Sequence, residues 1–100
     1  MKDVRITAVA KVRHDELIER YELPLEEECT VAVGDSFVSR GGERPAGLCD
    51  GAWQAMEPFV RSLAAGGGKF YGDWMRDPFS AMVSCNDGFR PVSFYIEVID

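Results

Sequence analysis

One stretch of the chain, from Gly47 to Gly68, constrains the fold more than any other. Its apolar residues recur at spacings of three and four, which predicts an amphipathic helix over about residues 50–65: Ala52, Trp53, Met56, Phe59, Val60, Leu63 and Ala64. Asp50 can cap the start of this helix, and the three glycines that close the stretch can end it. Pro58 lacks an N–H and its ring crowds the preceding turn, so we expect either a kink there or two helical segments.

Segments on both sides of this helix alternate as β-strands do. The first begins at Val4, ends near His14, and places these apolar residues on one face: Val4, Ile6, Ala8, Ala10 and Val12. Residues 36–40 form a short predicted strand. Residues 79–85 and 92–98 form a predicted hairpin around the turn Asn86-Asp87-Gly88-Phe89.

The 100 residues are predicted to form a single domain, 1–100, of the α+β class. We expect a small antiparallel sheet of about four strands that could curl towards a barrel, packed by the kinked helix. A short helix over about residues 15–21 is also predicted, with Asp15 as its cap. Three apolar residues of this helix lie at helical spacing and are expected to pack inward: Leu17, Ile18 and Tyr21.

The acidic character of the chain is concentrated in residues 15–28. This segment holds seven acids and one base, Arg20, and seven minus one accounts for the whole net charge of −6. Charge runs usually form solvated surfaces, and the alternative is a docking surface for a basic protein partner. Because the rest of the chain is neutral, no basic groove for phosphates is expected, and we predict no nucleic-acid binding.

Membrane, secretory and nucleotide-binding classes fit the sequence poorly. No apolar run approaches the ~18 residues of a membrane span, and the first residues alternate charged and apolar side chains. We therefore expect a cytoplasmic protein. Gly66-Gly67-Gly68-Lys69 lacks the other residues of a phosphate loop and follows a helix instead of preceding one, so no nucleotide cofactor is expected.

The cysteines allow three interpretations. Cys29, Cys49 and Cys85 could form a zinc site if the fold brings them together, although the usual Cys-x-x-Cys pairs are absent. Cys49 precedes the predicted helix, whose dipole would activate a thiol. All three could equally be structural residues, because free cysteines are often buried.

Seven residues are candidates for a ligand site at the helix start, the aromatic loop and the 85–90 turn: Cys49, Asp50, Trp53, Trp74, Cys85, Asp87 and Arg90. The aromatic loop, residues 70–75, could cover the core or line a ligand pocket. The structural alternative for the turn is that Asp87-Gly88 serves the hairpin while Arg90 pairs with Asp87 or Asp50.

Two of these segments resemble the motifs of a known family. Cys49-Asp50-Gly51-Ala52-Trp53 is similar to its Cys-Asp-x-Ala-Trp, and residues 85–92 are similar to its Cys-x-Asp-Gly-x-Arg-Pro-Val. Cys29 with Gly34 to Phe37 resembles a third, looser motif, with Thr30 where the family has proline. The family consists of small prokaryotic proteins without an established activity, so the resemblance implies no mechanism.

Three functions remain open. The first is a small non-catalytic binding or accessory domain for a small-molecule ligand, with its site at the helix start and the 85–90 turn. The second is a thiol- or metal-dependent enzyme that uses Cys49 and Cys85. The third is a protein-interaction module that uses the acidic segment, with a homodimer through an open sheet edge as a further option.

Overall fold

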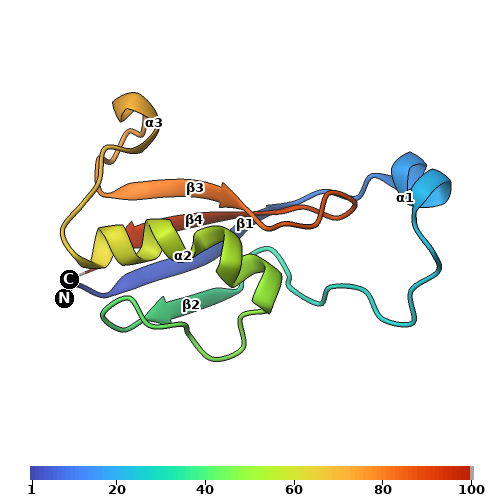
Figure 1. Cartoon of the computed structure of the whole chain (residues 1–100), viewed down its shortest axis with the longest axis horizontal. Helices are drawn as coiled ribbons and strands as arrows, with labels where there is room; N and C mark the ends of the chain where they lie inside the picture. The colour runs from blue at the N-terminus through green and yellow to red at the C-terminus, as the bar shows by residue number, and fades with distance from the viewer. Residues whose placement is uncertain (100) are drawn as a thin grey trace.

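The computed structural model describes residues 1–99, which form one antiparallel sheet with a helix across one of its faces (Figure 1). Within these residues the strands lie in the order β2-β1-β4-β3, so that the first and last strands of the chain are neighbours at the centre. The elements in chain order are β1 (Val4–Lys11), α1 (Asp15–Tyr21), β2 (Ser36–Ser39), α2 (Asp50–Ala64), α3 (Phe70–Asp73), β3 (Ser80–Ser84) and β4 (Val92–Val98). The α+β prediction is confirmed. The sheet does not curl into a barrel, because β2 and β3 are separate edges of an open sheet.

The core lies between α2 and the central strands. The predicted stripe of α2 faces the core: Phe59 is partly buried, and the buried members are Ala52, Trp53, Met56, Val60, Leu63 and Ala64. They pack against alternate residues of β1 and β4: Val4, Ile6, Ala8, Val92, Phe94 and Ile96. Burying one large apolar side chain contributes roughly 1.5–3 kcal/mol, so this layer supplies most of the stability.

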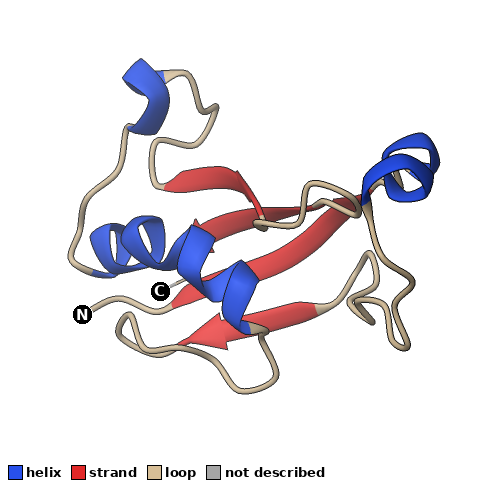
Figure 2. Ribbon diagram, turned by 45° about the vertical axis from the view of Figure 1, so that its right-hand side comes forward, coloured by secondary structure: helices blue, strands red, loops and turns tan. Residues whose placement is uncertain are grey.

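The helix α2 is continuous through Pro58, so the alternative of two separate segments is wrong. Its ribbon changes direction near the middle (Figure 2). Pro58 lies on the exposed face, where water can bond the carbonyl that loses its intrahelical partner. Cys49, not Asp50, occupies the N-cap position. At the other end Gly66 has a φ of 93°, which is the left-handed conformation expected of a terminating glycine.

Beyond Ala8, β1 departs from the predicted alternation. A bulge between Ala8 and Ala10 shifts the register with β4, and Val9 and Val12 become exposed. The backbone of Val12 and His14 still bonds the hairpin turn, so the two segments run on together past the end of α2. Figure 1 shows α1 at the far end of this extension.

The helix α1 has the predicted bounds but not the predicted packing. None of its residues, Asp15–Tyr21, is buried, because no other element covers its apolar side chains. Asp15 does not cap it either: its carboxylate bonds Arg13, and His14 stands at the N-cap position without a side-chain bond. This end of the molecule is therefore not held by apolar packing.

The predicted closing hairpin is confirmed. The strands β3 and β4 pair antiparallel from Ser80–Glu97 to Ser84–Ser93. The aromatic loop forms the short helix α3, in which Tyr71 has a left-handed backbone. Phe70 packs edge-on against Phe59 of α2, with ring centroids 5.2 Å apart, so this loop is fastened to the end of the core.

Candidate functional site

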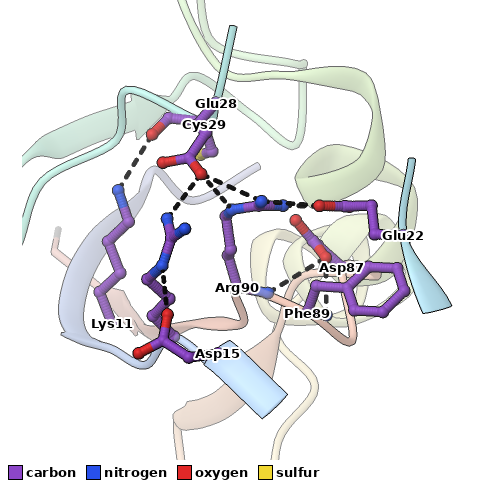
Figure 3. Close-up of polar contacts among 9 residues, drawn as sticks. Lys11, Asp15, Glu22, Glu28, Cys29, Asp87, Phe89 and Arg90 are labelled. Carbon is purple, nitrogen blue, oxygen red and sulfur yellow. Dashed lines mark hydrogen bonds and ion pairs between the residues drawn. The ribbon is translucent and has the colours of Figure 1, made fainter. Parts of the chain in front are cut away.

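The most distinctive polar feature is a buried guanidinium at the end of the hairpin turn. The side chain of Arg90 is only 5% exposed. Its Nη1 and Nη2 donate to the two carboxylate oxygens of Glu22 at 3.1 and 2.6 Å, and its Nε donates to Oε1 of Glu28 at 3.0 Å (Figure 3). The prediction that Arg90 pairs with Asp87 or Asp50 is therefore wrong. Two-point pairing of this kind fixes geometry as well as charge.

Arg13 extends this contact into a network. Its Nη1 lies 2.5 Å from Oε1 of Glu28, and its Nε lies 2.6 Å from Asp15. The hydrogen bond from Arg13 holds the pKa of Glu28 below its usual range, and Glu22 raises the pKa of Arg90. Both shifts favour the charged forms of Glu28 and Arg90, so the pairing reinforces itself.

We call residues 15–28 the acidic arm. Arg13 and Arg90 bind it at both ends, since Asp15 opens the arm, Glu28 closes it and Glu22 lies between them. Lys11 secures the chain just beyond it by donating to the carbonyl oxygens of Cys29 at 3.0 Å and Val31 at 2.9 Å. Lys11 at the end of β1, Arg13 just after it and Arg90 of the hairpin turn thus hold the arm in one position.

The arm nevertheless leaves apolar side chains in water. Leu23 is 83% exposed and Tyr21 is 68% exposed, and Leu17 and Leu25 are also exposed. The arm also carries four acids that form no ion pair within residues 1–99: Glu16, Glu19, Glu26 and Glu27. The exposed surface of the arm is therefore both apolar and negative.

The other predicted residues of the 85–92 motif have structural tasks in the turn. Oδ1 of Asp87 accepts from the backbone N–H groups of Phe89 at 2.8 Å and Arg90 at 3.2 Å. Sγ of Cys85 accepts from the N–H of Val92 at 3.3 Å, and the N–H of Cys85 donates to the carbonyl of Val92 at 3.0 Å. These bonds close the hairpin and aim Arg90 at the arm.

The predicted residues at the helix start also support the structure. Asp50 pairs with Arg44 at 2.6 Å, and Trp53 is buried in the core. Cys49 is exposed, and its carbonyl accepts the first helical bond from Trp53. Four of the best-formed surface pockets of residues 1–99 are lined by other residues and by none of these three side chains.

Trp74 lies apart from these residues. It follows α3, which Figure 1 places at the opposite end of the sheet from the hairpin turn. Its ring, 74% exposed, leans on Tyr71 with a centroid distance of 5.3 Å. The two tryptophans therefore do not form one wall with the 85–90 turn.

The three cysteines remain free thiols in the described part of the chain. Within residues 1–99 no group of three or more His, Cys, Asp or Glu side chains is arranged to hold a metal ion. The structure thus does not assemble the predicted zinc site from Cys29, Cys49 and Cys85.

Comparison with protein-family models, with curated proteins and with solved structures found no match for this chain. In residues 1–99 no helix has both the length and the apolar character needed to cross a membrane.

Glu22 and Glu28 are the site residues that sequence reasoning missed. Their partner Arg90 is 68 and 62 residues away along the chain. One signal could have pointed to them: the acidic arm contains a single base, so any of its carboxylates that the fold buries needs a partner from elsewhere in the chain.

Proposed function

We propose that this chain is a non-catalytic, cytoplasmic protein-interaction domain whose acidic arm docks a partner that is both basic and apolar. One observation carries the proposal: a buried ion cluster fixes a segment whose own apolar side chains stay exposed. Removing a guanidinium from water is costly unless its partners are well placed. The Arg90 cluster therefore favours a role for the position of the arm, since the arm adds no buried apolar residue from α1 to the core.

The composition of the arm indicates the partner. Tyr21, Leu23 and Leu25 offer apolar contact area, and aromatic residues are enriched at protein interfaces. The four unpaired carboxylates around them favour a complementary face that carries Lys or Arg beside Leu-like residues. An amphipathic basic helix has this chemistry.

The alternatives receive less support. At the helix start and the 85–90 turn, Asp50, Asp87 and Arg90 already have partners within the chain. The small-molecule site there, the thiol enzyme and the resemblance to the prokaryotic family stay predictions, as does a homodimer through an open sheet edge. None of them has a structural feature comparable to the fixed, exposed arm.

The experiment is a calorimetric titration of the chain with a synthetic amphipathic helix of Lys and Leu. We expect binding that weakens at least about tenfold when ionic strength rises from about 0.05 to 0.5 M, because exposed charges are screened over a few ångströms at high salt. The double variant Tyr21→Ser/Leu23→Ser should weaken binding by about tenfold or more.

Val33→Ser is the matched control, because Val33 is 60% exposed but lies outside the arm. It should bind the peptide as the wild type does. Absence of binding, or equal loss in the control and in the arm variant, would contradict the proposal. Thermal unfolding of each variant confirms that the fold is intact.

A further inference from the structure

A pocket of about 360 Å³ lies where the acidic arm meets Arg90. Its apolar lining comes from α1 and the residues that follow it: Ile18, Leu23, Pro24 and Leu25. Its charged lining comes from the arm and from the two bases that hold it. The pocket is thus amphipathic, with an apolar side formed by the arm itself.

The charges in this pocket do not cancel. Three carboxylates line it (Glu19, Glu22 and Glu28) and two guanidinium groups line it (Arg13 and Arg90), so three minus two leaves one negative charge. Both oxygens of Glu22 are occupied by Arg90. Glu19 has no ion pair among residues 1–99, and Arg13 and Arg90 both bond Glu28 through Oε1, not Oε2. The pocket therefore has acceptors for one more cation.

We propose that the pocket receives one long cationic side chain, an arginine or a lysine, from the partner. This inference rests on the proposed function and locates the centre of the docking surface. The methylene stem of such a side chain lies along apolar surface while its charged end seeks a carboxylate, which matches the lining. The end group bonds Glu19 and the free oxygen of Glu28.

Anionic ligands fit the same pocket poorly. Arg13 and Arg90 already donate to carboxylates of the arm, so an anion would have to displace an internal partner. A neutral apolar group would leave Glu19 without a partner beside a desolvated surface. The pocket therefore favours a ligand that has both an apolar methylene stem and a positively charged end group.

Three small probes test this without a peptide, and two of them, n-butylguanidinium and butylurea, are nearly equal in size. n-Butylguanidinium has stem and charge, butylurea has the stem without the charge, and guanidinium has the charge without the stem. Titrations followed by NMR should show millimolar binding of n-butylguanidinium at the methyl groups of Ile18, Leu23 and Leu25. Both other probes should bind at least about fivefold more weakly.

Glu19→Gln should weaken binding of n-butylguanidinium by about fivefold or more, because it removes the surplus charge at constant shape. Glu16→Gln is the matched control, since Glu16 lies on the same helix but does not line this pocket. Equal affinity for all three probes, or equal effects of the two substitutions, would overturn the inference.

The two proposals fail separately. If the Lys–Leu helix binds the arm but n-butylguanidinium does not bind the pocket, the subsite is wrong and the docking surface stands. If n-butylguanidinium binds with the expected selectivity while the helix does not bind, the pocket is real and the proposed docking function is wrong.

Discussion

The α2 layer covers β1 and β4, and the acidic arm lies beyond the ends of the same two strands, yet different forces hold the two regions. Under α2 the chain is fixed by interlocking apolar side chains, with Met56, Val60, Leu63 and Phe94 at most 1% exposed. At the arm it is fixed by Arg13 and Arg90 on three carboxylates, while leucines point into water. Apolar burial is insensitive to moderate changes of pH and salt, whereas ion pairs are not. The molecule therefore combines a robust scaffold with an arm that responds to its surroundings.

The largest expected effect is in the scaffold. Phe94→Ala should lower the free energy of unfolding by about 3–5 kcal/mol, because it leaves a cavity between α2 and β4. Chemical denaturation measures this loss. Tyr21→Ala in the arm is the control and should change stability by about 0.5 kcal/mol or less, because its ring is largely exposed. Similar losses in both variants would show that the arm is part of the core after all.

Arg90→Met should release the arm and leave the scaffold folded. Hydrogen exchange of the α1 amides should accelerate by at least about tenfold, since two carboxylates lose their shared donor. The amides of β4 that face β1 should keep their protection. Arg44→Met removes an exposed pair with Asp50 and should leave α1 unaffected. Unchanged exchange in α1 would show that Arg90 does not hold the arm, and equal acceleration in β4 would show that the two regions are not independent.

Acid should release the arm before it unfolds the scaffold. The pKa of Glu28 is lowered in the folded protein, so its stabilising contribution is complete above the ordinary Glu pKa of about 4.3. That contribution is lost as pH falls below this value through the depressed folded-state pKa. NMR spectra between about pH 7 and 3 should show α1 signals changing before those of α2.

Glu28→Gln is the control for the pH experiment. It removes the titrating group, so the α1 signals should already be altered at neutral pH and should change less on acidification. An unchanged acid transition in this variant would assign the pH dependence to other carboxylates of the arm.

The smallest expected effect is in an exposed ion pair of α2. Glu57→Gln breaks the contact with Arg61, 3.1 Å long, and should cost about 0.2–0.5 kcal/mol. Denaturation curves of this variant and of Phe94→Ala should show the smallest and the largest losses in the free energy of unfolding of the scaffold. A loss several times larger would indicate that ion pairs stabilise α2 as they do the arm.

The scaffold could be predicted from the sequence because its signals are local and periodic. The stripe of α2, the closing hairpin and the short strand at Ser36–Ser39 all follow from spacing and turn chemistry. Pro58 was a less reliable signal, since an exposed proline bends a helix that tertiary packing keeps continuous. The bulge at Val9 has no comparable signal, so the exposure of Val12 could not be foreseen.

The arm could be predicted only in outline. Its helix and its charge are visible in the sequence, but whether Leu17 and Tyr21 are covered depends on whether another element reaches them. The pairing of Arg90 with Glu22 depends on the path of the intervening chain. Asp87 was a nearer and chemically adequate partner, and only the fold shows that its carboxylate is occupied by backbone N–H groups.

The central position of β1 and β4 has a consequence for how the protein folds. Val4 pairs with Val98, so the middle of the sheet joins segments that lie far apart in the sequence. A contact of this kind requires closure of a long loop, which costs chain entropy before the contact contributes any stabilisation. Topologies rich in such contacts therefore fold slowly, in roughly milliseconds to seconds. During synthesis β1 has no central neighbour until the last strand is made, and the apolar face that α2 covers stays incomplete until then. We therefore expect the pairing of β1 with β4 to be the late, rate-determining step in the folding of this chain.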